Sequence, residues 1–66
     1  MYRIKVKRYL LKTSITLQRK IFGIWVYWDG YNVKSSTPSF HESEAMIIAN
    51  SLMKIKEIPV ERLLVY

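Results

Sequence analysis

Basic side chains near the start of the chain have a spacing that suits phosphate binding. Arg3, Lys5 and Lys7 alternate with apolar residues, which is the period of a β-strand with one face in water. Residues 1–28 contain no Asp or Glu, so no nearby acid neutralises this row. The 66-residue chain has 11 Lys and Arg against 5 Asp and Glu, and its net charge of +6 indicates an anionic partner. A solvated strand face without a partner is the alternative interpretation.

Aromatic side chains gather in residues 20–34 and suit a second kind of chemistry, which is stacking. Trp28 is in phase with Ile24 and Val26 and is expected in the core. Trp25 and Tyr27 are in phase with the other face, where a base could stack on them. We expect the cations to meet phosphates and the remaining side chains to meet base edges or faces. The expected nucleic-acid contacts are Arg3, Lys5, Lys7, Arg8, Tyr9, Gln18, Lys20, Trp25 and Tyr27.

No arrangement of residues for catalysis or metal binding stands out. His41, the only histidine, lies beside Glu42 and Glu44, but without cysteine or a second histidine these three make a poor metal site. The serines have no predicted base, and the two glycines, Gly23 and Gly30, form no phosphate-binding loop. We therefore expect a protein that is not an enzyme and that holds no metal and no cofactor.

Strands in the first half of the chain must position these residues. Alternation predicts the first two strands, with a turn at Thr13-Ser14 between them, and Gly23 permits a turn before the third. Asp29-Gly30 between aromatic flanks predicts a type I′ hairpin turn into a short fourth strand. The predicted strands cover about residues 2–11, 14–22, 24–28 and 31–34.

A helix is predicted at about residues 40–56, where apolar residues recur every three or four positions. Ser39 and Glu42 have the spacing of a capping box, and His41 between them is interpreted as part of this cap. Residues 62–66 are apolar enough for a last strand, either at the sheet edge or across a dimer interface. The expected core contains Ile4, Val6, Leu17, Val26, Trp28, Ile48 and Leu52.

Together these elements predict one small α+β domain over residues 1–66, with a three- to four-stranded antiparallel sheet packed on one helix. So few strands leave unpaired edges, and we expect a homodimer. The first apolar residues alternate with cations and form no signal-peptide core, so we expect a cytoplasmic protein, in the host cell if a phage encodes it. The longest apolar run is far shorter than the roughly 20 residues that span a bilayer, and no membrane role is expected.

The order of these segments resembles AP2-type and integrase arm-binding domains. In that pattern a three-stranded antiparallel sheet with a central Trp precedes a helix that opens with Phe-x-Thr-x-Glu-Ala. Here GIWVYW precedes SFHESEAMIIANSL, and Trp25, Phe40, Glu44 and Ala45 hold the matching places. The resemblance spans residues 15–53, and His41-Glu42-Ser43 departs from the usual run of residues at the helix start. Small ββα proteins encoded by phages and mobile elements share the same helix opening.

The resemblance implies a sheet that inserts in the DNA major groove and contacts it through Gln18, Lys20 and Trp25. We therefore expect a non-catalytic DNA-binding protein encoded by a phage or mobile element. The alternative is a small phage-type protein that binds an acidic host protein through the same surface and inhibits it. Phosphate binding weakens steeply with salt, whereas a hydrophobic protein interface changes little, so salt dependence separates the two.

Overall fold

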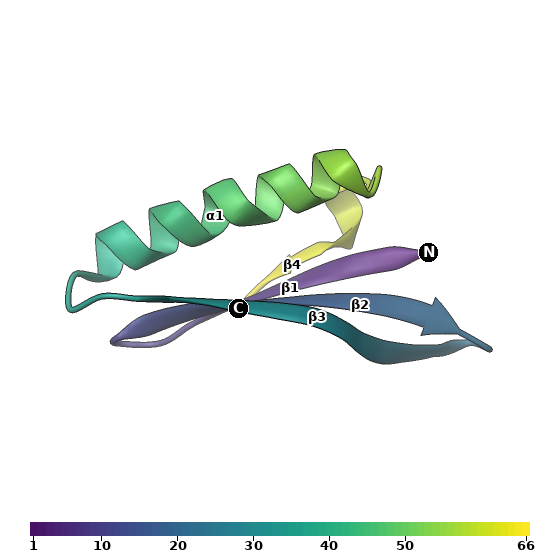
Figure 1. The fold of residues 1–66 in the computed structure, drawn as a ribbon, viewed down its shortest axis with the longest axis horizontal. Coiled ribbons are helices and arrows are strands. Elements are labelled where there is room, and N and C mark those ends of the chain that lie inside the picture. Colours follow the sequence, from purple (N-terminus) through teal and green to yellow (C-terminus); the bar gives the residue numbers. More distant parts are fainter.

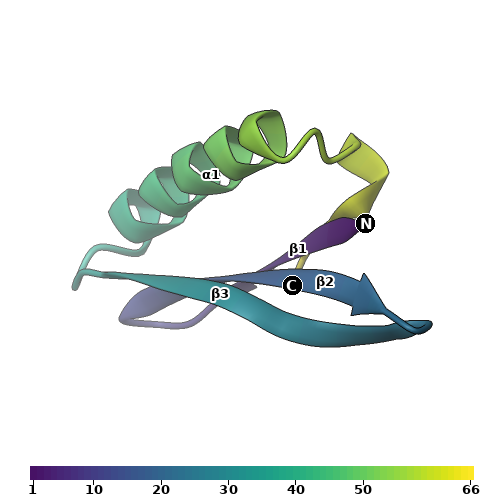
Figure 2. The same ribbon diagram turned by 45° about the vertical axis from the view of Figure 1, so that its right-hand side comes forward.

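Three long strands, one helix and a short closing strand make up the fold in a computed structural model that describes all 66 residues (Figure 1). The strands form one sheet in the order β3-β2-β1-β4, and α1 lies across one of its faces (Figure 2). The elements are β1 Tyr2–Arg8, β2 Lys12–Ile21, β3 Ile24–Lys34, α1 Pro38–Ile55, a 3-10 turn Val60–Arg62 and β4 Leu63–Val65.

The α+β class, the sheet of at most four strands and the helix in the second half of the chain are confirmed. The first three strands pair antiparallel, with Ile4 opposite Leu17 and Leu17 opposite Asp29. The closing strand β4 is present, but it pairs parallel to β1, so the sheet is mixed rather than wholly antiparallel. This direction follows from the path of the chain, because α1 carries it back along the sheet before β4 begins (Figure 1).

The boundary between the first two strands differs from the prediction. β1 ends at Arg8, residues 9–11 form the connection, and the backbone N–H of Tyr9 donates to the Lys12 carbonyl at 2.8 Å. Thr13 and Ser14 therefore lie inside β2 and form no turn. A polar pair taken by itself indicates a turn, but here Thr13 faces the helix and its hydroxyl forms a hydrogen bond with His41 in the core.

The predicted hairpin turn at Asp29-Gly30 is wrong, because β3 runs without a break from Ile24 to Lys34. The turn predicted at Gly23 is confirmed, because the chain reverses at Phe22-Gly23, where both residues have positive φ, 51° and 79°. The Asp-Gly pair follows a β-bulge between Leu17/Gln18 and their partners in β3. The Tyr27 side chain lies over Gly30, where a Cβ would be 2.7 Å from its hydroxyl oxygen.

The helix begins earlier than predicted, and the capping box is wrong. Thr37 is the N-cap residue and Pro38 is the first helical residue, with no side-chain capping hydrogen bond. Ser39 and Glu42 are therefore both inside the helix. At the other end the N–H of Ile58 donates to the Met53 carbonyl at 2.8 Å, and Glu57 has a φ of 53°. This geometry is a Schellman motif, in which the left-handed residue is Glu57 rather than glycine.

A small core fills the space between the sheet and α1. Ala45 and Ala49 present fully buried methyl groups to the strands, which allows the helix to lie close to the sheet. Ile48 and Leu52 are half-buried and pack against its margin, whereas Val26, also expected in the core, lies outside it on the edge strand β3. Trp28, expected in this core, is 46% exposed: it is the residue without a partner at the bulge of the edge strand β3, and its ring lies under Arg19. The buried apolar residues are Ile4, Val6, Ile15, Leu17, Ala45, Ala49 and Ile58.

Candidate nucleic-acid interface

The sheet face opposite the helix is not covered by any element, and it is called the open face below (Figures 1 and 2). Alternation along the paired strands decides which side chains it carries. Ile4 and Leu17 point to the helix, so their neighbours Lys5 and Gln18 point away from it. The same alternation and the ring contacts place these residues on the open face: Arg3, Lys5, Lys7, Tyr9, Lys12, Ser14, Thr16, Gln18, Lys20, Trp25, Tyr27, Asn32, Lys34 and Tyr66.

The open face is strongly positive. It carries six cations and no carboxylate, because Asp29 lies opposite Leu17 on the helix side and the four glutamates follow β3 in the chain. The only ion pair of the protein, between Arg8 and Glu42 at 3.8 Å, is on the helix side. None of the open-face cations therefore has an acidic partner. The six cations are Arg3, Lys5, Lys7, Lys12, Lys20 and Lys34.

Aromatic rings lie between these cations. The guanidinium of Arg3 stacks on Trp25, with its Cζ 4.4 Å from the ring centroid, and its Nε donates to Gln18 Oε1 at 2.6 Å. Lys20 contacts the same ring of Trp25 at 5.8 Å, and Lys5 lies 5.7 Å from the centre of the Tyr66 ring. The negative ring faces offset part of the repulsion between neighbouring cations. Arg3 is thus held in one orientation without an acid.

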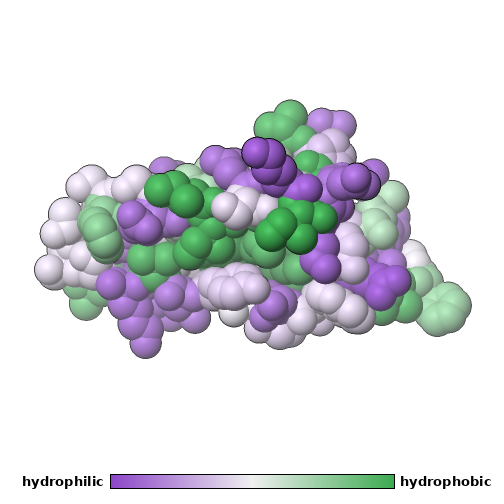
Figure 3. Space-filling view, turned by 45° about the horizontal axis from the view of Figure 1, so that its top comes forward, coloured by the Kyte–Doolittle hydropathy of each residue, from purple (hydrophilic) through white to green (hydrophobic).

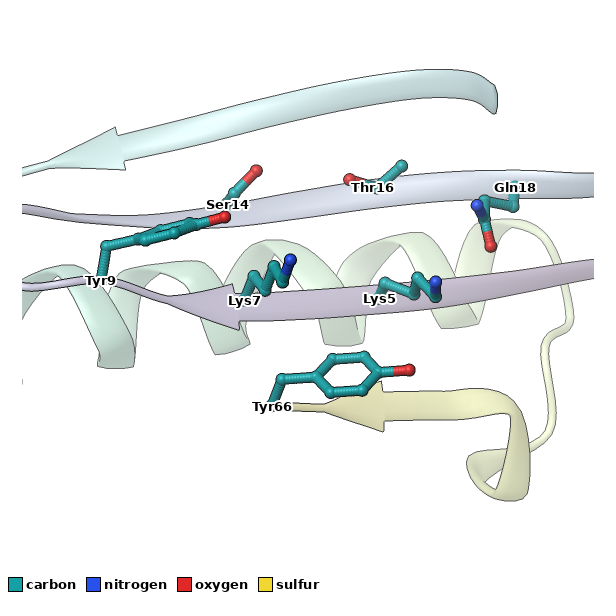
Figure 4. A pocket seen from close by; sticks show the side chains of 7 residues that line it. All are labelled: Lys5, Lys7, Tyr9, Ser14, Thr16, Gln18 and Tyr66. Atoms are coloured by element: carbon teal, nitrogen blue, oxygen red, sulfur yellow. The ribbon is translucent and has the colours of Figure 1, made fainter. Parts of the chain in front are cut away.

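A shallow groove of about 390 Å³ crosses the middle of the open face (Figure 4). Lys5 and Lys7 lie between the Tyr66 ring on one side and the polar side chains of β2 on the other, with Tyr9 at one end. The β2 side chains are Ser14, Thr16 and Gln18. Ammonium groups beside hydroxyl and amide donors and flat rings can bind a phosphate and stack a base at the same place.

Arg8 does not belong to this surface, although it was expected there. In β1 it shares the helix side with Ile4 and Val6. Its Nε donates to the Tyr66 carbonyl at 2.9 Å, and its Nη1 lies 3.8 Å from Glu42. Arg8 therefore ties the end of the chain and the helix to β1. Every other expected contact residue lies on the open face.

Sequence reasoning missed several members of the open face. Ser14 was assigned to a turn and Lys12 was outside the predicted strands, although both continue the alternation of β2. Tyr66 was missed because its position depends on the pairing of β4 with β1, which no local pattern reveals. The alternation of residues 12–20 was the signal that could have identified the first two.

His41 lies in the core and takes no part in the open face. It is fully buried, with Nδ1 2.6 Å from Thr13 Oγ1 and Nε2 3.1 Å from the Leu10 carbonyl oxygen. Both ring nitrogens are thus used, and the earlier interpretation of His41 as part of a helix cap is wrong. No cluster of three metal-ligating side chains is present.

No family model, curated protein sequence or solved structure matches this chain. The resemblance to AP2-type and integrase arm-binding domains therefore stays a prediction. The single helix, α1, lacks the length and apolar character needed to cross a bilayer.

Proposed function

We propose that the protein is a non-catalytic DNA-binding protein that holds nucleic acid on the open face of its sheet. The observation that carries this proposal is the set of six open-face cations, none with an acidic partner, interleaved with aromatic rings. Solubility alone does not call for a single-sign surface of this kind, whereas phosphate binding does.

Different members of the open face have different roles in this proposal. Lys5 and Lys7 neutralise phosphates at the groove, where no carboxylate competes with the ligand. Tyr27 is 67% exposed and supported by Gly30, so its ring is available for stacking. Trp25 is half-buried beneath Arg3, so its ring positions the guanidinium, whose planar donors suit a phosphate or a guanine edge.

Charge reversal on the open face tests the proposal. The double variant Lys5→Glu/Lys7→Glu should weaken binding to duplex and single-stranded DNA at least about tenfold and reduce the salt slope by about 2. The matched control is Lys54→Glu/Lys56→Glu, which makes the same change in net charge at the end of α1. Fluorescence anisotropy at two salt concentrations measures both quantities. Equal binding by the Lys5/Lys7 variant and the parent protein would contradict the proposal.

A second candidate function is the binding of a host protein, through the apolar outer surface of the helix rather than through the open face. Apolar side chains are exposed on the outer surface of the helix, where Ile47 is 58% exposed and Ile55 is 72% exposed. Figure 3 shows apolar side chains gathered on this side of the molecule. Binding through such a surface should persist at high salt, in contrast to phosphate binding. The anisotropy experiment therefore also decides between the two functions.

A further inference from the structure

The β2–β3 hairpin extends past the rest of the sheet. Tyr2, the first residue of β1, pairs with Arg19, and the N–H of Lys20 donates to the Met1 carbonyl. Beyond that point residues 21–24 have no neighbouring strand except one another. The turn lies at one end of the longest molecular axis, which measures 39 Å (Figures 1 and 2).

Phe22, at this tip, suits its position neither by its backbone conformation nor by its exposure. Phe22 has a φ of 51°, in the left-handed region that favours glycine, asparagine or aspartate. Its side chain is 100% exposed and therefore packs on nothing. Ile24 is also 65% exposed, so the tip is an apolar projection rather than a polar turn. Asn-Gly at positions 22 and 23 would favour both the turn and the solubility of the protein more than Phe-Gly does.

Positive charge adjoins the apolar tip. Lys20 precedes it on the open face, and Arg19 lies on the helix side between Tyr2 and Trp28, within 5.8 Å and 5.0 Å of the two ring centres. No acid occurs in residues 1–28. The row of cations then continues from Lys20 along the open face. An apolar wedge beside a row of unpaired cations is the arrangement by which proteins insert side chains between bases while holding the phosphates.

We propose that Phe22 inserts between neighbouring base pairs of a DNA duplex whose phosphates are held by the open face. This inference rests on the proposed function. A lipid surface could also accept an apolar tip flanked by cations. A bilayer that met the tip would, however, leave Lys5, Lys7 and Lys12 further along the long axis of the molecule without a partner. A duplex lying along the sheet meets both features.

The test uses a duplex that carries the fluorescent base 2-aminopurine, whose emission rises when its neighbours unstack. The parent protein should raise the emission, and Phe22→Asn should abolish the rise and weaken binding about tenfold. The melting temperature of Phe22→Asn should stay equal or increase, because Asn-Gly suits the turn. The matched control is Leu10→Asn, which removes another exposed apolar side chain, 78% exposed, from the other hairpin loop. This control should behave like the parent protein.

Three results would overturn the inference. If Phe22→Asn unstacks and binds the duplex as the parent does while Lys5→Glu/Lys7→Glu loses binding, the wedge is wrong and the proposed function stands. If the parent binds only single strands, or no DNA, insertion into a duplex is wrong. If the parent protein instead binds vesicles of phosphatidylcholine and phosphatidylglycerol and Phe22→Asn does not, the tip is a membrane contact.

Discussion

The ring of His41 joins three segments of the chain at the level of single atoms. The Leu10 carbonyl can only accept, so Nε2 carries a proton and donates to it, and Nδ1 shares a hydrogen bond with the Thr13 hydroxyl. The two contacts satisfy both ring nitrogens inside the core. The sequence did not reveal this role, because both partners are far from His41 along the chain and neither belongs to a motif.

Substitutions at Thr13 and His41, made singly and together, should show that the two side chains are energetically coupled. Thr13→Val keeps the shape of the side chain but leaves Nδ1 of His41 without a partner, at a cost of about 1–3 kcal/mol in the free energy of unfolding. His41→Leu leaves the Thr13 hydroxyl without a partner. The double variant should lose less than the sum of the two, by about 0.5–3 kcal/mol, in urea denaturation. Additive losses would show that the two side chains are not coupled.

Tyr31 carries the one clear electrostatic perturbation of the molecule. Its hydroxyl donates to Asp29 Oδ2 at 2.9 Å, and this hydrogen bond, together with the carboxylate charge, raises the pKa of Tyr31 above its ordinary value. The contact contributes fully to stability below the ordinary tyrosine pKa and is lost as pH rises through the raised pKa. In Asp29→Asn the pKa of Tyr31 should fall toward the ordinary value. NMR titration of labelled tyrosine rings measures this shift, and an unchanged pKa would contradict the assigned cause.

Among the secondary-structure elements, the long hairpin shows where local patterns succeed and fail. Alternation predicted strands at about residues 2–11, 14–22, 24–28 and 31–34, and it predicted the two faces of β1 and β2 correctly. It failed at Asp29-Gly30, because a dipeptide that suits a turn also fits in a strand next to a bulge, where the Tyr27 ring lies over the glycine. At the actual turn, Phe22-Gly23, the sequence indicated only the glycine as a turn residue, because phenylalanine is disfavoured at the first turn position.

The end of α1 offers a simple stabilising change. Glu57 adopts the left-handed conformation that closes the Schellman motif, and a side chain there is strained. Glu57→Gly should therefore raise the free energy of unfolding by about 1 kcal/mol. The same change at the exposed helix position Glu44 should instead lower it by about 1 kcal/mol. Thermal melts followed by circular dichroism compare the two variants, and destabilisation by Glu57→Gly would refute this account of the helix end.

The whole molecule rests on a small core. Only 9 of its 66 residues are buried, and chains of this size usually have about 3–5 kcal/mol of stability. Leu17→Ala, at the centre of the sheet, should cost about 2–5 kcal/mol and leave much of the protein unfolded at room temperature. Ile47→Ala on the exposed helix surface should change stability by less than about 0.5 kcal/mol. A cooperative native-like melt of Leu17→Ala would contradict this.

The candidate interface was predictable to the extent that it depends on strand alternation. Lys5, Lys7 and Gln18 were placed correctly because each lies in the middle of a paired strand. Arg8 was misplaced because it was taken with its basic neighbours rather than by its position in the alternation. The contribution of Tyr66 could not be predicted, since it comes from a pairing between opposite ends of the chain.

The parallel pairing of β4 with β1 also limits how copies of this chain can add strands to one another. β4 covers part of the β1 edge and presents only three residues of its own at that side, whereas β3 offers an edge of eleven. A sheet with one long free edge can be extended once, by a second β3 related by a two-fold axis, and the joined sheet then has only short edges left. We therefore expect strand addition between copies of this chain to favour a two-fold pair through β3.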